Sequence, residues 1–177
     1  MKEILKPCLT VFMIMVVTSA AVSLVFALTE EPIAEQARLA QAAAMNRLLV
    51  ADTFEELSEG NFWRATANAQ TVGYIVEISS RGFAGPINML VAVDTTGVVA
   101  GVEVVSHGET PGLGTPITEA WFTSQFEASY GPFIFTRSTP INYTEIPVLT
   151  GATVSTSAVI AGVNEAVELL HALQGGR

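Results

Sequence analysis

The sequence predicts an α+β protein in which one N-terminal transmembrane helix precedes a single domain, whose mainly antiparallel sheet is flanked by helices. Three observations predict this class. Residues 7–29 form an uncharged apolar run, three strand-like segments lie between residues 74 and 105, and residues 157–173 carry apolar side chains at helical spacing. The expected organisation is an anchor over residues 1–29, a stalk helix and connection over residues 30–70, and the domain over residues 71–177.

The uncharged run at residues 7–29 is long enough to cross a membrane. As a helix it would extend about 34 Å, and the hydrocarbon core of a bilayer is about 30 Å thick. Lys2 and Lys6 precede the run and two glutamates follow it, which places the N-terminus in the cytoplasm and the domain outside it. A cleaved signal peptide ending near Val-Phe-Ala at 25–27 is the alternative, although the core of a signal peptide has only about 7–15 residues.

The charged and metal-binding residues exclude several classes of function. From residue 29 onward there are 16 acidic residues and 6 arginines, a poor balance for binding nucleic acid, which requires a positive surface. Cys8 is the single cysteine and lies in the apolar run, so the chain offers neither an internal disulfide nor a thiolate metal site. His107 and His171 are the only histidines, and no HExxH, P-loop or Rossmann pattern occurs. We therefore expect no nucleic-acid partner and no metal site.

The segment between the anchor and the first strand has two different patterns. Residues 31–49 have Pro32 in their first turn and carry a stripe of small and apolar residues, which predicts the stalk helix. Asp52–Asn68 is mixed in composition, and we expect loops or a short helix there.

Three segments have the pattern of strands: Tyr74–Ser79, Ile87–Asp94 and Val98–Val105. The second is almost entirely apolar, as expected of a central strand, and Thr-Thr-Gly at 95–97 predicts a hairpin turn after it. The glycine-rich segment Arg81–Pro86 either serves turn geometry alone or allows the backbone to approach a planar ligand beside Phe83.

The segment Ser106–Gly114, SHGETPGLG, is too rich in glycine and proline for a helix or strand and predicts an ordered loop. Its polar residues either face water or serve a site. Thr-Pro at 115–116 then predicts a helix over Ile117–Tyr130, and Phe133–Phe135 predicts a short edge strand.

The segment Leu149–Val159, LTGATVSTSAV, leads into the helix expected over residues 157–173 and carries five hydroxyl side chains. The start of a helix has unpaired backbone N–H groups and a positive dipole end, so it can receive a phosphate. The alternative is an ordinary helix cap in which the hydroxyls serve only the backbone.

The order of these features resembles a known family. An N-terminal anchor, the loop SHGETPGLG after a pair of strands, and TGAT before the last helix are typical of the FMN-binding domain of the G subunit of the Rnf ion-translocating electron-transport complex. The C subunit of the sodium-pumping NADH:quinone oxidoreductase is a close relative of that family. The resemblance covers most of the chain and depends mainly on the pairing of the two motifs.

The resemblance implies a covalent flavin. A phosphoester would join FMN to the last threonine of the TGAT motif, Thr153, and a separate flavin transferase would install it from flavin adenine dinucleotide. Glu109, Thr110 and Leu113 would contact the isoalloxazine. The domain would lie on the extracytoplasmic side of the cell membrane, and its partners would be the other membrane and redox subunits of the complex.

The residues around Thr153 suit this chemistry. Thr150, Ser155 and Thr156 can donate hydrogen bonds to phosphate oxygens, and small neighbours keep the backbone accessible. The cofactor-binding set that we expect is Thr153, Thr150, Gly151, Ala152, Ser155, Thr156, Glu109, Thr110, Leu113, Gly114 and His107. One position departs from the family pattern: Pro147 stands where an aspartate is usual, and Glu145 is the nearest acid. Either recognition by the transferase is weaker here, or the transferase has a different preference.

Three functions remain open at this point. The first is an electron carrier with covalent FMN inside an ion-translocating complex, a redox subunit and not an independent catalyst. The second is a membrane-anchored assembly or binding module that binds flavin loosely or not at all. The third, a free-standing reductase, lacks a recognisable acid–base pair to support it.

Overall fold

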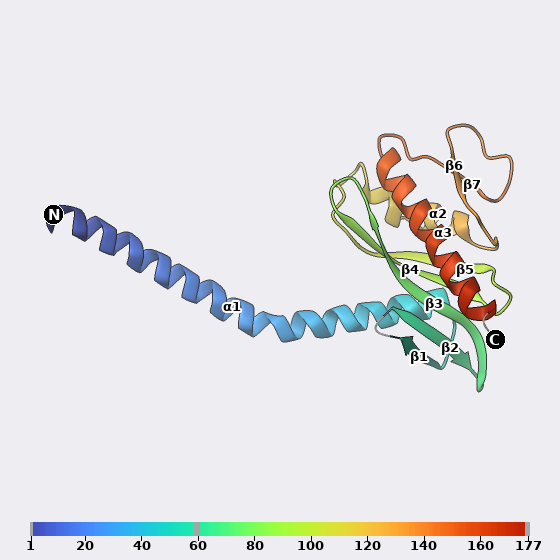
Figure 1. Ribbon diagram of the computed structural model, residues 1–177, viewed down its shortest axis with the longest axis horizontal. Helices are drawn as coiled ribbons and strands as arrows, with labels where there is room; N and C mark the ends of the chain where they lie inside the picture. Colours follow the sequence, from blue (N-terminus) through green and yellow to red (C-terminus); the bar gives the residue numbers. More distant parts are fainter. Residues whose placement is uncertain (1, 59–60, 176–177) are drawn as a thin grey trace. The chain divides into compact units, whose positions relative to one another are not determined.

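The structure is a computed structural model that describes residues 2–58 and 61–175 (Figure 1). The chain divides into two compact units, residues 1–42 and 43–177. The first unit consists of most of helix α1, which runs from Lys2 to Leu48 and therefore ends within the second unit. The second unit contains the sheet and all the other helices of the described residues.

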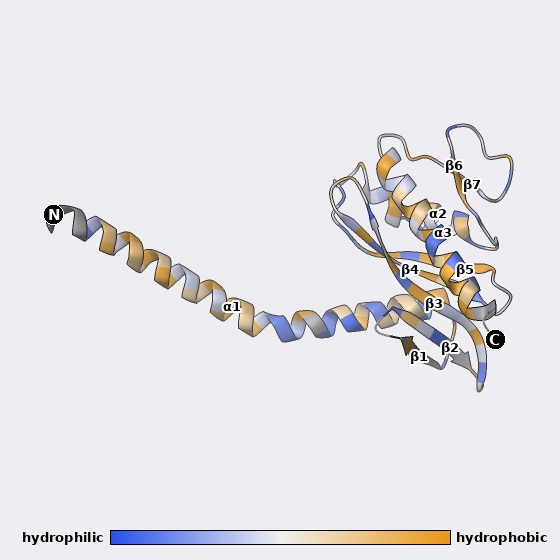
Figure 2. Cartoon of the chain, viewed as in Figure 1, coloured by the Kyte–Doolittle hydropathy of each residue, from blue (hydrophilic) through white to orange (hydrophobic). Residues whose placement is uncertain are grey.

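The first part of α1 is apolar on all sides. Phe12, Leu24 and Phe26 are each at least 60 % exposed, and hydrophobic residues cover the helix until hydrophilic ones replace them further along (Figure 2). Thr18 and Thr29 donate their hydroxyl hydrogen bonds to carbonyls one turn earlier, at 2.8 Å each. A helix that is apolar all round with internally satisfied polar groups suits a bilayer, and α1 is long and apolar enough to cross one. Cys8, a free thiol, is exposed on this helix.

The second unit contains a five-stranded antiparallel sheet in which each strand pairs with the next along the chain. This confirms the α+β class and the strand pairing predicted from the sequence. The strands are β1 Thr53–Ser58, β2 Phe62–Ala67, β3 Gln70–Arg81, β4 Pro86–Asp94 and β5 Val99–His107.

The prediction of loops or a short helix for Asp52–Asn68 is wrong, because this segment supplies β1 and β2. β2 pairs with β3 and buries Trp63 and Ala65 on one face. β1 lies at the edge of the sheet, and its exposed Glu55 forms an ion pair with Arg64 at 3.2 Å. The charged side chains of β1 and β2 obscured the alternating pattern that predicts a strand. This segment is extended because β2 pairs with β3 and β1 pairs with β2.

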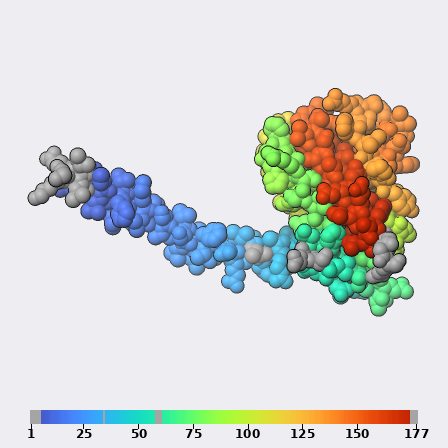
Figure 3. Space-filling view, in the orientation of Figure 1, coloured from blue at the N-terminus to red at the C-terminus, as the bar shows by residue number. Residues whose placement is uncertain are grey.

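The interior strand β4, which lies between β3 and β5, is buried on both faces. Met89 and Val91 point to one core, and Leu90 and Ala92 point to the other, all with no exposed surface. The first core lies under helix α3, Thr153–Gly175, whose Val159, Val163, Ala166 and Leu170 are fully buried. The outer side of α3 lies at the surface of the domain, beside β3 and β6 (Figure 3).

The second core is covered by the last turns of α1. Ala44 and Met45 are almost completely buried against Trp63 and Leu90, and Leu48 and Leu49 pack around them. Two glycines of the sheet leave space for these leucines, Gly73 for Leu49 and Gly101 for Leu48. A methyl group added at Gly101 would lie 2.8 Å from Leu48 Cδ2.

The helix predicted over Ile117–Tyr130 is wrong in its extent. The structure has three short pieces instead: the 3-10 helix η1 Thr115–Thr118, helix α2 Ala120–Thr123 and the 3-10 helix η2 Ser124–Phe126. Phe122, Phe126 and Phe133 pack edge to face with ring centroids 5.7 and 5.0 Å apart. This buried aromatic row bends the chain back over the core, and a straight helix of that length would not bring Phe133 to it.

Two elements at the C-terminal side differ from the expectation in detail. The short strand β6, Ile134–Thr136, lies one residue later than predicted and pairs in parallel with β7, Glu145–Pro147, which the sequence did not predict. Helix α3 begins at Thr153, four residues earlier than expected, so TGAT itself forms the entrance of the helix.

Gly73 in β3 leads to a first prediction, because a methyl group there would collide with the carbonyl oxygen of Val93 and lie 2.8 Å from Leu49 Cδ1. We expect Gly73→Ala to lower the free energy of unfolding by about 2 kcal/mol, since a backbone carbonyl cannot move without disturbing the β3–β4 pairing. Urea denaturation followed by tryptophan fluorescence measures this. At Gly85 the nearest atom would be 3.8 Å from the methyl group, so Gly85→Ala is the matched control. Equal losses in both variants would contradict the argument.

The β4–β5 turn is where the hairpin was predicted, and Asp94 holds it. Asp94 Oδ1 accepts hydrogen bonds from the backbone N and the Oγ1 of Thr96 at 2.7 Å each and from Val98 N at 3.0 Å. Partial burial opposes ionisation of this carboxyl, but the hydrogen bonds outweigh it and lower the pKa of Asp94 below its ordinary value of 3.8.

A pH dependence follows from Asp94. Because its folded-state pKa is lower than that of the unfolded chain, its stabilising effect is complete above the unfolded value and is lost as the pH falls through the folded one. We expect wild type to be more stable than Asp94→Asn by about 1 kcal/mol near neutral pH, and the difference to shrink below about pH 4. Urea titrations at a series of pH values test this, and a difference that stays constant in acid would contradict it.

Candidate functional site

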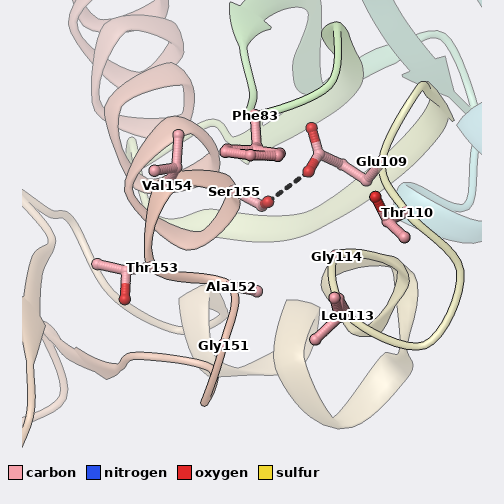
Figure 4. A pocket seen from close by; sticks show the side chains of 10 residues that line it. All are labelled: Phe83, Glu109, Thr110, Leu113, Gly114, Gly151, Ala152, Thr153, Val154 and Ser155. Atoms are coloured by element: carbon pink, nitrogen blue, oxygen red, sulfur yellow. Dashed lines mark hydrogen bonds between the residues drawn. The ribbon is translucent and has the colours of Figure 1, made fainter.

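A cavity of about 310 Å³ lies at the entrance of α3 (Figure 4). Three segments line it: the β3–β4 connection, the loop that follows β5, and the first residues of α3 with the turn before them. We call it the α3 pocket. Its lining residues are Phe83, Glu109, Thr110, Leu113, Gly114, Gly151, Ala152, Thr153, Val154 and Ser155.

The register of the sheet explains why these loops meet. Arg81 pairs with Pro86 across the β3–β4 connection, and Ile87 pairs with His107 at the end of β5. The connection at residues 82–85 and the loop at residues 108–114 therefore leave the same end of the sheet. Antiparallel pairing of three consecutive strands thus brings two sequence-distant loops together.

The loop after β5 is held in a tight turn by its own backbone. The N–H groups of Leu113 and Gly114 donate to the Thr110 carbonyl at 3.2 and 3.0 Å, and the N–H of Gly112 donates to Thr115 Oγ1 at 2.7 Å. Gly112 has a φ of 79°, in the left-handed region that favours glycine. The turn leaves Leu113 more than half exposed on the wall of the α3 pocket.

Glu109 is the buried acid of the α3 pocket, with only 6 % of its surface exposed. Ser155 Oγ donates a hydrogen bond of 2.6 Å to its Oε2, and the backbone N–H of Ala84 donates to its Oε1 at 3.2 Å. The backbone N–H of Glu109 itself donates to His107 Nδ1 at 3.1 Å. The hydrogen-bond partners of the carboxyl group therefore come from the other two segments of the pocket.

The entrance of α3 has no side-chain cap of its own. The Thr156 N–H donates to the Ala152 carbonyl at 2.9 Å, which puts Ala152 at the N-cap position, and alanine offers no side-chain acceptor. The amides of Thr153, Val154 and Ser155 lie in the first turn, where amides have no acceptor within the helix. Gly151 before them has a φ of 82°. These features leave an anion-accepting helix end at the pocket.

The hydroxyls of this segment have different environments. Thr156 is fully buried and donates to the Ala152 carbonyl at 2.9 Å, and Ser155 is occupied by Glu109. Thr150 is exposed but does not line the pocket. Thr153 lines the pocket, is partly exposed, and has no side-chain hydrogen bond to any of the described residues.

The structure brings together most of the predicted site. Thr153, Gly151, Ala152, Ser155, Glu109, Thr110, Leu113 and Gly114 line the α3 pocket. Thr150, Thr156 and His107 do not, and the hydroxyl of Thr156 serves the backbone in the way that the helix-cap alternative described. Within the described residues, no group of three His, Cys, Asp or Glu side chains is placed to hold a metal ion.

Two lining residues were absent from the predicted set. Phe83 is 75 % exposed and borders the pocket from the β3–β4 connection, where the glycine-rich sequence gave a signal for a close ligand. Val154 lies inside the hydroxyl-rich segment and is half exposed. Because its neighbours in sequence are polar, nothing in the pattern distinguished it from an ordinary helix residue.

Family comparisons agree with this arrangement. Residues 82–168 match the model of the FMN-binding domain, and residues 1–48 match the model of the RnfG N-terminal region. The first match includes every residue that lines the α3 pocket. These matches give the class of the protein: an FMN-binding domain on a chain whose N-terminal helix is long and apolar enough to cross a membrane.

The curated relatives specify the family. The G subunit of the proton-translocating ferredoxin:NAD(+) oxidoreductase complex of Clostridium ljungdahlii is 35 % identical, over 82 % of this chain and 80 % of the relative. The G subunit of the ion-translocating oxidoreductase complex of Methanosarcina acetivorans is 33 % identical over 98 % of both chains. The chain belongs to the family of G subunits of the ion-translocating Rnf oxidoreductase complexes. It is a single-pass membrane subunit, and other subunits of such a complex are its partners.

A solved structure shares the fold. NqrC of Shewanella oneidensis superimposes with a TM-score of 0.55 at 18 % identity. The match covers 66 % of this chain and 61 % of NqrC, so this chain spans about three fifths of the length of that structure. At this identity the likeness shows the fold alone.

Gly114 gives a prediction about the α3 pocket. A methyl group added there would lie 2.6 Å from Glu109 Cβ and 2.7 Å from its Oε2. We expect Gly114→Ala to lower the free energy of unfolding by about 2 kcal/mol, because Glu109 is held on two sides and cannot move away. Gly108→Ala, whose methyl group would be 3.6 Å from the nearest atom, is the control in the same loop. Urea denaturation compares the two, and a Gly114→Ala chain as stable as the control would contradict this packing.

Proposed function

We propose that this chain carries an FMN joined by a phosphoester to Thr153 and passes electrons between other subunits of its complex. The domain lies on the extracytoplasmic side of the membrane. The chain acts as a redox subunit and not as an independent catalyst. A flavin transferase is its maturation partner, and the donor of the flavin is flavin adenine dinucleotide.

The environment of the Thr153 hydroxyl is the observation that carries the proposal. Among the three hydroxyl side chains that line the α3 pocket, Ser155 is bonded to Glu109, and Thr110 lies on the opposite loop. Thr153 lies at the first position of α3, and its hydroxyl has no protein partner among the described residues. It is thus the hydroxyl that combines access to the pocket with a place at the anion-accepting helix end.

The α3 pocket has parts that suit both ends of FMN. The amides of the first turn of α3 can donate to phosphate oxygens, and the missing side-chain cap leaves them available. Phe83, Leu113 and Val154 offer an apolar surface of the kind that a flat aromatic ring covers, and the volume is within the range of small-molecule sites. FMN, when bound, supplies the redox chemistry by accepting and donating electrons. The protein contributes position and surroundings.

Flavin adenine dinucleotide is the only co-substrate that the attachment to Thr153 requires. The Thr153 Oγ would form a bond to the phosphorus of the FMN half of flavin adenine dinucleotide, and the bond between the two phosphates would break. Adenosine monophosphate leaves with that phosphate oxygen, and the hydroxyl proton is released. No oxidant is needed.

Glu145, the acid nearest in sequence to the motif, accepts hydrogen bonds from Ile141 N and Asn142 Nδ2, so its carboxylate faces its own loop.

The proposed side of the membrane rests on the distribution of charge. Lys2 and Lys6 precede the apolar part of α1, while the residues that follow it are predominantly acidic. Short basic segments stay in the cytoplasm, which places the N-terminus there and the domain outside. A covalent bond would keep the flavin with the protein in a compartment from which a dissociated cofactor would be lost.

Substitution of Thr153 tests the proposal. We expect the full chain, produced together with its own flavin transferase, to exceed its polypeptide mass by the mass of FMN less one water and to fluoresce in a denaturing gel. Thr153→Val should lose both signals completely, because valine has the same shape but no hydroxyl. Thr71→Val, the same change in a partly buried threonine of β3 outside the pocket, is the control and should keep both.

The outcomes separate the candidate functions. A Thr153→Val chain that retains the adduct would mean that another residue carries the flavin. A wild-type chain without any adduct would leave the assembly or binding module as the remaining function.

A further inference from the structure

The buried carboxylate of Glu109 joins the three segments that form the α3 pocket (Figure 4). It belongs to the loop after β5, and its two oxygens are bonded to Ser155 of α3 and to the backbone of Ala84 in the β3–β4 connection. The distance from Ser155 Oγ to Oε2 is 2.6 Å, at the short end of the range for O–H···O hydrogen bonds. No ion pair to Glu109 is found in the described part of the chain.

Two glycines make room for this carboxylate. A methyl group at Gly82 would collide with Glu109 Oε1, and one at Gly114 would lie 2.7 Å from Oε2. Both glycines are buried. One glycine in the β3–β4 connection and one in the loop after β5 therefore give space to the same side chain.

We propose that Glu109, held by Ser155 and Ala84, is a positioning residue that fixes the shape of the α3 pocket and places one uncompensated negative charge in its wall. This inference rests on the proposed function, because the charge acts on the FMN in that pocket. Ser155 thereby has a different role from the phosphate ligand that the sequence suggested. Its hydroxyl hydrogen is committed to Glu109.

The two effects of Glu109 can be separated by substitution. Glu109→Gln removes the charge, while its amide can still accept from Ala84 N and donate to Ser155 Oγ. Ser155→Ala leaves the charge and removes one of the two ties. A negative charge near the flavin opposes the addition of electrons, so its loss should make the flavin easier to reduce. Loss of the hydrogen bond between Ser155 and Glu109 should make the loops at residues 82–85 and 108–114 more mobile.

The charge is tested by the reduction potential of the attached flavin. We expect Glu109→Gln, in the full chain carrying FMN, to shift the midpoint potential upward relative to wild type. Glu119→Gln removes the same charge from an exposed residue outside the pocket and should leave the potential unchanged. A potential that is equal in the two variants would overturn the proposal. Loss of the adduct in Glu109→Gln would also overturn it, because the proposal gives Glu109 no part in attachment.

The positioning role of the Ser155–Glu109 hydrogen bond is tested in chains that carry no flavin. In full chains that carry Thr153→Val, we expect Ser155→Ala to increase amide hydrogen exchange severalfold in residues 82–85 and 108–114. Ser157→Ala, a partly buried serine of α3 outside the pocket, should not change it. Unchanged exchange in Ser155→Ala would overturn the positioning role even if FMN is attached at Thr153. Conversely, a wild-type chain without FMN would remove the proposed function, while a positive exchange result would still support the tie.

Discussion

Burial of β4 on both faces is the constraint on which the rest of the second unit depends. Met89 and Val91 require a cover on one side, and Leu90 and Ala92 require one on the other. Helix α3 supplies the first cover, and the last turns of α1 together with Leu49 supply the second. Because α3 crosses the sheet on the first face, its N-terminal end comes to the loops that leave β3 and β5. The position of the pocket is therefore a consequence of the core.

The pocket divides its chemical tasks among the three segments. The entrance of α3 contributes amides and the Thr153 hydroxyl, which suit a phosphate, while Phe83 and Leu113 contribute exposed apolar surface. Glu109 lies between them with its carboxylate turned toward protein donors. Such a buried acid is costly unless it is hydrogen-bonded, and here both oxygens are used. The two hydrogen bonds to Glu109 therefore offset the free-energy cost of burying its carboxylate, and they also fix the shape of the pocket.

The sequence was sufficient for the elements with a clear period or a clear turn. The apolar run before residue 30, the strands around Val91, the turn at Gly97 and the C-terminal helix all follow from local patterns. The two loop motifs, through their resemblance to a known family, predicted a site in segments that the structure brings together around the α3 pocket. In each case the signal lies in a short continuous segment.

The remaining parts depend on contacts between distant residues. Nothing local to β1 reveals that Glu55 forms an ion pair with Arg64 of β2. The row formed by Phe122, Phe126 and Phe133 breaks a helix that the sequence favours, since their packing outweighs local propensity. The sequence predicted that Ser155 and Thr156 donate to a phosphate, and it could not show that their hydroxyls already donate to Glu109 and to the Ala152 carbonyl.

The exposed thiol of Cys8 on α1 is the single cysteine of the chain, so the whole domain folds without sulfur chemistry. With one cysteine, no disulfide within the chain has to form or survive for the domain to fold, whichever redox compartment it occupies. The same thiol also offers a unique attachment point for a spectroscopic label on the anchor, with no cysteine to remove elsewhere.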